Sequence, residues 1–171
     1  MLLPFGGHGP ILHETVFVAP GAVLIGQVEA AAHCSFWFNA VVRADNDRIS
    51  FGEGTNIQDG CILHTDHGVP LEVGEGCVLG HAAVVHACTV GNRVTVGIGA
   101  RVLNGAVVED DVVIGAGALV PEGARLESGF LYLGVPARKA RPLRPDELDR
   151  FRAGAALYVE KARLYSSLLE R

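Results

Sequence analysis

Residues 84–120 read VVHACTVGNRVTVGIGARVLNGAVVEDDVVIGAGALV, and an apolar residue returns at every sixth position of this stretch. Four positions after each of these residues stands a small or slim one, beginning with Cys88 and Val94, and a glycine often follows directly, as in Val96-Gly97. No other period runs as far. The recurring apolar residues are Val84, Val90, Val96, Val102, Val108, Ile114, Val120 and Leu126.

A period of six fits neither the 3.6-residue repeat of an α-helix nor the two-residue repeat of an ordinary strand. It is typical of a short strand followed by a sharp bend, repeated many times. Three such segments close one triangular coil of about 18 residues, and stacked coils form a parallel β-helix. The recurring apolar residue then fills the interior, and the small residue fits where the chain turns. An open sandwich of short strands is the alternative, which so many evenly spaced hexads disfavour.

The same period continues upstream of residue 84, with two interruptions. The register shifts after residue 42 and again after residue 63, and turn residues predict loops over residues 45–50 (DNDRIS) and 65–71 (TDHGVPL). Val84 and Val85 compete for one interior position. The upstream interior residues are Leu24, Ala30, Phe36, Val42, Phe51, Ile57, Leu63, Val73, Leu79 and Val85.

After residue 143 the spacing changes to alternating steps of three and four, which marks one face of a helix. Pro145, Asp146 and Glu147 suit the first turn of that helix. We therefore predict an all-β domain over residues 1–143 and an α-helix over 144–171 that packs on the prism or on a neighbouring subunit. The apolar stripe of the helix is Leu148, Phe151, Ala155, Tyr158, Ala162, Tyr165 and Leu169.

Composition and charge narrow the possible partners. The net charge is −5 and no Lys/Arg tract occurs, so nucleic acid is a poor candidate. No apolar run reaches the roughly 20 residues of a membrane span, and the first residues lack the features of a secretion signal. A cytoplasmic protein is the expectation. The four cysteines show no CxxC pairing and lie in or near the small positions of their hexads, which favours buried packing roles over a zinc ribbon or disulfides.

The hexads assign each polar residue to one of three faces of the prism. We call the face that carries Leu63 face A, the face of Val73 face B and the face of Leu79 face C. His64 and His86 each follow an interior residue on face A, one coil apart. Because adjacent coils lie about 4.8 Å apart, the two imidazoles should stack with room for a metal ion between them.

His81 lies on face C, so it cannot easily reach the other two histidines within its own chain. If three prisms assemble with face C of one against face A of the next, a neighbour's His81 completes a site with His64 and His86. Three histidines with an open fourth position form a catalytic zinc arrangement. The same register places Arg43 beside His64 and Asp59 beside His81, which predicts an Arg43–Asp59 ion pair across the subunit boundary.

These residues resemble the gamma-class carbonic anhydrase family. The segments that carry the resemblance are VVRAD (41–45), NIQDG (56–60), ILH (62–64), LGHAAVVH (79–86), the hexads that follow and GFLYLGVPAR (129–138). The resemblance extends from about residue 10 to 143. It implies a left-handed β-helix that forms a homotrimer, with zinc sites between subunits; the handedness rests on the resemblance alone.

The resemblance also implies a reaction and a role for each residue. The reaction is the reversible hydration of carbon dioxide to bicarbonate. Zinc is the implied metal, although three imidazoles also suit iron or cobalt. The implied roles are His64, His81 and His86 as metal ligands, Arg43 and Asp59 as the pair between subunits, Asp45 as the acid of the RxD motif, and Asn56 and Gln58 as side chains that orient water or bicarbonate.

Two departures from the family pattern leave other functions open. Asn46 stands where well-studied members have a glutamate, and residues 65–70 (TDHGVP) replace a longer acidic loop with a proton-shuttling glutamate. Asp66 or His67 could substitute for that glutamate. The alternatives are a thioesterase or acyltransferase that acts on an acyl-CoA, and a non-catalytic metal-binding scaffold. An acyltransferase would not require three histidines at these positions.

Overall fold

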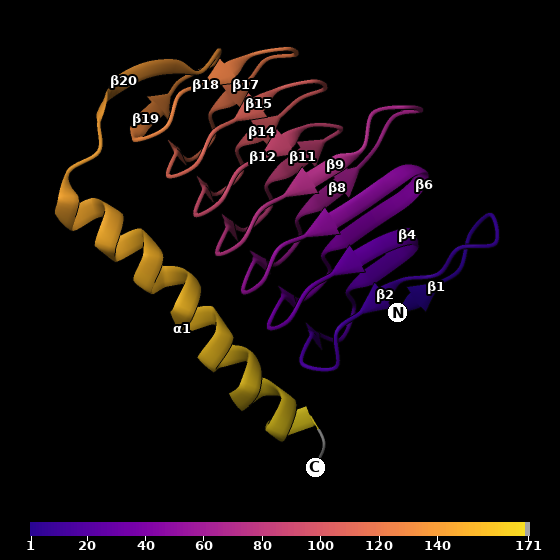
Figure 1. Ribbon diagram of the computed structural model, residues 1–171. Helices are drawn as coiled ribbons and strands as arrows, with labels where there is room; N and C mark the ends of the chain where they lie inside the picture. The colour runs from indigo at the N-terminus through magenta and orange to yellow at the C-terminus, as the bar shows by residue number, and fades with distance from the viewer. Residues whose placement is uncertain (170–171) are drawn as a thin grey trace.

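The computed structural model describes residues 1–169, which form a left-handed parallel β-helix followed by one α-helix (Figure 1). The predicted fold class is confirmed. Figure 1 shows the coils stacked along one axis and the helix running back beside them, from the last coil towards the N-terminal end. Within residues 1–169 no helix is both long enough and apolar enough to cross a membrane.

Short parallel strands build the three predicted faces. Face A contains β1 (Leu2–Leu3), β8 (Ile62–His64), β11 (Val84–His86), β14 (Arg101–Val102) and β17 (Leu119–Val120). Face B contains β2 (Ile11–Leu12), β9 (Leu71–Val73), β12 (Thr89–Val90), β15 (Val107–Val108) and β18 (Arg125–Leu126). Two long strands, β4 (Val23–Ala30) and β6 (Val41–Phe51), cross from face A to face B and join them into one sheet.

Face C is a separate sheet. Its strands are β3 (Phe17–Val18), β5 (Ser35–Phe36), β7 (Asn56–Ile57), β10 (Val78–Leu79), β13 (Thr95–Val96), β16 (Val113–Ile114), β19 (Phe130–Leu133) and β20 (Arg138–Pro142). All of them run parallel except β20, which pairs antiparallel with β19 and ends the prism.

The recurring apolar residues fill the interior, as the period predicts. Every upstream interior residue from Leu24 to Val85 is buried, and so are those from Val90 to Leu126. Val85 takes the disputed position, because it pairs in register with Leu63, whereas Val84 faces outward. Burial of this apolar column, at about 25 cal/mol for each Å² removed from water, is the main stabilisation of the fold.

The four cysteines are buried free thiols, as their small positions predict. Burial raises the pKa of Cys61 and of Cys88 to about 12. Thiols that stay protonated at neutral pH are inert packing residues.

One predicted loop is wrong and the other is confirmed. Residues 45–50 lie inside the continuous strand β6. Ala44 pairs with Gly26 and Ile49 with Val28, so residues 45–48 bulge opposite a single residue of β4. The neighbouring coil bonds to this bulge, since the Asp47 amide donates to Thr65 Oγ1, and turn-forming residues therefore remain in the sheet. The second loop covers residues 65–70, and Leu71 already belongs to β9.

Helix α1 (Pro145–Leu169) packs against face C, where it contacts β3, β5 and β7. Ala155 and Ala162 are buried there, and the Tyr158 and Trp37 rings pack edge-to-face with their centroids 5.2 Å apart. The predicted stripe packs on the prism as far as Tyr165, whose ring centroid lies 5.2 Å from that of Trp37, whereas Leu169 is 52% exposed. The division into domains at residue 143 stays a prediction.

The start of α1 is fixed by Glu147. Its carboxylate accepts hydrogen bonds from the Arg141 guanidinium at 2.7 and 2.8 Å and from the Arg144 amide at 3.0 Å. These hydrogen bonds lower the pKa of Glu147 to about 2. The amide contact is one half of a capping box, which satisfies a free N–H group at the helix start.

The glycine that follows an interior valine allows adjacent coils to approach closely. A Cβ atom on Gly97 would lie 2.5 Å from the Ala116 amide nitrogen and 2.7 Å from the Gly115 carbonyl carbon. Both are backbone atoms of the next coil, so they cannot move aside as a flexible side chain could. The close approach of adjacent coils therefore explains why glycine follows the interior valine.

Gly97→Ala should destabilise the protein by about 1–3 kcal/mol, because the added methyl group forces two coils apart. Chemical denaturation measures the change. Gly154→Ala is the matched control, since a Cβ there meets nothing within 4 Å. That control should stabilise α1 by up to about 1 kcal/mol, and equal effects of the two substitutions would contradict the packing argument.

Candidate metal centre

His64 and His86 stack on face A as the register predicts. Strands β8 and β11 are neighbours, and His86 pairs directly with His64. The ring centroids lie 4.9 Å apart. His64 Nδ1 and His86 Nε2 point at each other across 2.9 Å, so two potential metal-binding nitrogens converge on one point.

The remaining nitrogen of each ring is held by an oxygen acceptor. His64 Nε2 lies 3.0 Å from Asp45 Oδ1, and His86 Nδ1 lies 2.7 Å from Asn104 Oδ1. Metal-binding histidines usually donate their second N–H group to such an acceptor, which fixes the ring orientation and the tautomer. Both rings are half-buried. The orientation of each ring is therefore set by a second side chain.

Asp45 lies in the bulge of β6, between Arg43 and His64. Burial alone would raise the pKa of the Asp45 carboxyl, but hydrogen bonds from Arg43 and His64 outweigh it and hold that pKa below its ordinary value. Asp45 is therefore a carboxylate at neutral pH. Its two oxygens are divided between the Arg43 guanidinium and His64 Nε2.

His81 has a similar arrangement on face C. It follows β10, one coil after Asp59, and its Nδ1 lies 2.7 Å from Asp59 Oδ2. The two side chains are 44% and 41% exposed. With Nδ1 held by a carboxylate, Nε2 is the nitrogen that His81 can offer to a ligand outside its own chain.

Asn56 and Gln58 lie on the same face as His81 and are buried. Gln58 Nε2 donates to Asn56 Oδ1 at 3.1 Å, and Asn56 Nδ2 donates to the Cys77 carbonyl at 3.2 Å. These bonds orient the pair and leave the Gln58 side-chain carbonyl as its free acceptor. Asn56, itself held by the carbonyl of Cys77 in the next coil, thus fixes the orientation of the Gln58 amide group.

The predicted site residues form two groups on two faces of one chain. Arg43, Asp45, His64 and His86 lie on or beside face A, and Asn56, Gln58, Asp59 and His81 on or beside face C. Within residues 1–169, no three His, Cys, Asp or Glu side chains come together closely enough to hold a metal ion. In a single chain Arg43 pairs with Asp45 and Asp59 with His81, so the Arg43–Asp59 pair between subunits stays a prediction.

The sequence interpretation missed Asn104. A signal was present, because Asn104 follows His86 by 18 residues, which is one coil in this part of the chain. An asparagine in a turn is common for purely local reasons, so its spacing from His86 did not single it out.

Comparison with known proteins places these residues in a family. The chain is 44% identical over 167 residues to Protein YrdA of Escherichia coli, covering 94% of this chain and 91% of that protein. It is 43% identical over 150 residues to a Methanocaldococcus jannaschii protein named Probable carbonic anhydrase, covering 88% and 94%. It is also 37% identical over 164 residues to Gamma carbonic anhydrase 2, mitochondrial, of Arabidopsis thaliana, covering 92% and 59%.

The chain belongs to the gamma-carbonic-anhydrase-like family of hexapeptide-repeat proteins. A solved structure of a hexapeptide transferase family protein from Anaplasma phagocytophilum superposes with a TM-score of 0.93 at 36% identity, over 96% of this chain and 98% of that one. No model of a known protein family matches the sequence.

The donor set of this gamma-carbonic-anhydrase-like chain fits a zinc-type ion. A tetrahedral ion with Zn–N bonds of about 2.0–2.1 Å holds two nitrogens roughly 3.3 Å apart. His64 Nδ1 and His86 Nε2 lie 2.9 Å apart, so a small rotation of the two rings accommodates the ion. A hydrogen bond between these nitrogens uses one proton, whose place a metal ion would take.

His81→Ala should remove bound metal while leaving the prism folded, because the side chain lies outside the interior. Metal content by atomic emission and melting by circular dichroism measure the two effects. His67→Ala is the matched control, since His67 is an exposed histidine of the loop 65–70. Full metal content in His81→Ala, or loss of metal in His67→Ala, would contradict this assignment of ligands.

Proposed function

We propose that this protein catalyses the reversible hydration of carbon dioxide at sites shared between subunits of a homotrimer. His64 and His86 of one subunit and His81 of the next would hold a zinc ion, or iron or cobalt in its place. One observation carries the proposal: each of the three histidines has one ring nitrogen held by a side-chain oxygen, which leaves the other ring nitrogen as the one that can bind a metal. On face A these two nitrogens, His64 Nδ1 and His86 Nε2, already lie 2.9 Å apart.

A bound zinc ion supplies Lewis-acid chemistry, because it lowers the pKa of water to about 7 and makes hydroxide available at neutral pH. The Gln58 carbonyl would accept a hydrogen bond from the reacting water and so orient it towards carbon dioxide. Asn56 would keep Gln58 in that orientation through the 3.1 Å hydrogen bond. Arg43 of one subunit would pair with the second carboxylate oxygen of a neighbour's Asp59, whose Oδ2 atom holds His81, and this ion pair would align face A with face C.

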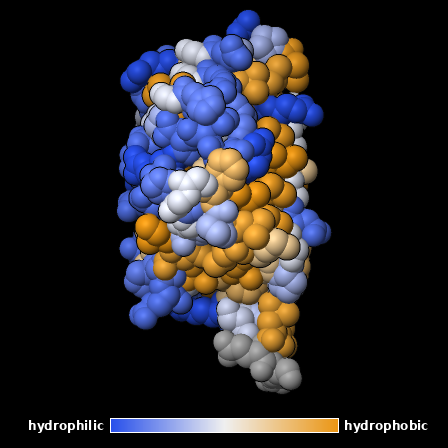
Figure 2. All heavy atoms as spheres, turned by 90° about the vertical axis from the view of Figure 1, so that its right-hand side faces the viewer, coloured by the Kyte–Doolittle hydropathy of each residue, from blue (hydrophilic) through white to orange (hydrophobic). Residues whose placement is uncertain are grey.

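The outer surface supports the assembly. On face A the outward residues Val23, Val41, Ile62 and Val84 lie side by side on β4, β6, β8 and β11. Ile62 is 51% exposed, and Ile98, in the coil after His81, is 59% exposed. Figure 2 shows hydrophobic residues gathered in a continuous band on one side of the molecule. Apolar surface of this kind marks an interface between proteins.

An acyl-CoA thioesterase or acyltransferase is the second candidate, because a hexapeptide transferase family protein shares the whole fold. A metal-binding scaffold is the third, since the loop 65–70 is short. Bound metal with thioester cleavage would favour the thioesterase. Acyl transfer without bound metal would favour the acyltransferase, and bound metal with neither activity would favour the scaffold.

A mixture of two inactive variants tests the shared site. His64→Ala and His81→Ala should each bind little metal alone, but co-refolded trimers would contain interfaces that combine the intact half of each. In a random 1:1 mixture about one quarter of the interfaces would be complete. Metal content and activity should recover to roughly that fraction. No recovery from the mixture would rule out a site that spans two chains.

Carbon dioxide hydration by stopped flow tests the reaction. Zinc- or cobalt-loaded protein should show turnover that His81→Ala lacks. Gln58→Ala should bind metal normally and lower kcat/KM by about 10- to 100-fold, the usual effect of a supporting side chain. Absence of turnover in fully loaded protein would overturn the carbonic anhydrase proposal.

A further inference from the structure

Asn104 connects a proposed metal ligand to the loop beside it. It lies in the turn after β14, half-buried, one coil beyond His86. Its Oδ1 atom lies 2.7 Å from His86 Nδ1, and its Nδ2 atom donates to Asp66 Oδ2, also at 2.7 Å. Asn104 is thus hydrogen-bonded on one side to a histidine and on the other to a carboxylate.

The carboxylate decides which way the Asn104 amide faces. The oxygen and nitrogen ends of an amide have nearly the same shape, so its hydrogen-bond partners must choose between them. An ionised Asp66 can only accept, which turns Asn104 Nδ2 towards it and Oδ1 towards His86. His86 Nδ1 must then carry the proton, and His86 Nε2 keeps its lone pair for a ligand.

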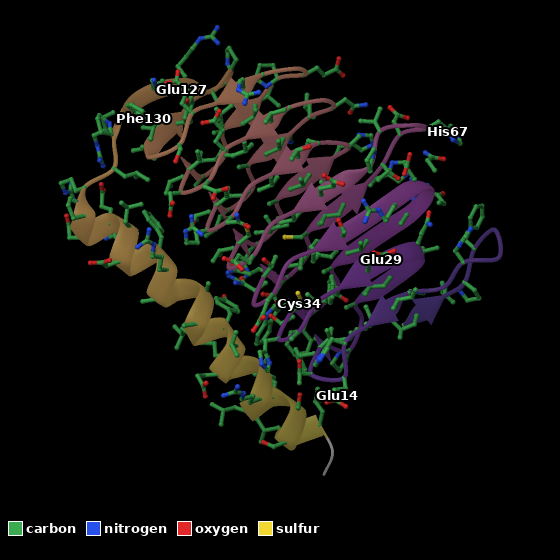
Figure 3. All side chains as sticks on the ribbon, in the orientation of Figure 1. Glu14, Glu29, Cys34, His67, Glu127 and Phe130 are labelled. Atoms are coloured by element: carbon green, nitrogen blue, oxygen red, sulfur yellow. The ribbon has the colours of Figure 1, made fainter. Side chains whose placement is uncertain are left out.

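Asp66 is held in place by the loop 65–70. Thr65 is fully buried, and its hydroxyl accepts from the Asp47 amide and donates to the Asp47 carbonyl. The Val69 amide closes the loop by donating to the Asp66 carbonyl at 3.1 Å, with Gly68 at a φ of 74°. Figure 3 shows His67 at the outer tip of the same loop. The short loop therefore presents Asp66 to Asn104 from a fixed position.

We propose that Asn104 and Asp66 are positioning residues that fix the orientation and tautomer of His86. His64 and His81 are each held directly by a carboxylate, whereas His86 is held by a neutral amide with a carboxylate behind it. The inference rests on the proposed function in one respect, namely that His86 binds the metal. It gives Asp66 a positioning role, as the hydrogen-bond partner of Asn104, in place of a proton-carrying role.

Substitution of Asn104 tests the inference through metal affinity. Asn104→Leu keeps the size of the side chain but removes both hydrogen bonds, so zinc affinity should fall about 10- to 100-fold. Competition with a chelator measures the affinity, and the visible spectrum of the cobalt-loaded protein should change with the coordination of His86. Asp66→Ala should lower the affinity in the same direction. His67→Ala should leave both measurements unchanged.

An exchange of the two side chains separates positioning from a general structural effect. Asn104→Asp alone places two carboxylates face to face and should weaken zinc binding. Asn104→Asp combined with Asp66→Asn restores the donor and acceptor order, because the new carboxylate accepts from His86 and from the new amide. The double variant should recover most of the affinity and the wild-type cobalt spectrum.

Three outcomes would overturn the inference. Wild-type affinity and spectrum in Asn104→Leu would show that Asn104 does not position His86. Loss of turnover in Asp66→Ala at unchanged affinity, with rescue by imidazole buffer, would identify Asp66 as a proton carrier. A wild-type protein that binds no metal would overturn the proposed function and this inference together. A protein that binds metal without hydrating carbon dioxide would fail the proposed function alone, since affinity and spectrum still report on Asn104.

Discussion

The parallel register between adjacent coils, in which His86 pairs with His64 and Leu79 with Ile57, is the constraint on which the other features depend. Backbone hydrogen bonds fix each strand against the strands of the coils above and below, so a residue's place in its hexad determines both its face and its neighbours. The interior valines and leucines make that register favourable, because a shift of one residue would bring them to the surface. The side chains of the site inherit their positions from this stacking.

The division of the site between two faces has a physical basis in the prism. Along one straight face of the prism the outward side chains form columns. Each column brings together residues one coil apart, such as His64 and His86. A third ligand would need a different direction of approach, which a neighbouring prism would supply in the proposed trimer. In the single chain, Arg43 is bonded to Asp45 and Asp59 to His81. Each of these side chains thus has a hydrogen-bond partner within its own chain.

The sequence predicts the features that depend directly on the six-residue period. The interior residues, the buried cysteines, the stacking of His64 on His86 and the separate place of His81 all follow from counting hexads. The bulge at residues 45–48 does not, because DNDRIS has the composition of a loop and its inclusion in β6 depends on hydrogen bonds to Thr65 from a later coil. The register places Asp59 beside His81 and Asn104 one coil after His86, but the hydrogen bonds within these pairs depend on side-chain rotamers, which no repeat pattern specifies.

The bulge of β6 and the loop 65–70 both lie at the corner between faces A and B, on successive coils. On either side of this corner the interior pairing is undisturbed, with Val42 against Leu63 and Phe51 against Val73. This corner therefore accommodates a different number of residues on successive coils without a change of register on either side. A single scaffold can acquire a longer or shorter rim beside the histidines through insertions and deletions alone, and so change its chemistry without rebuilding its core.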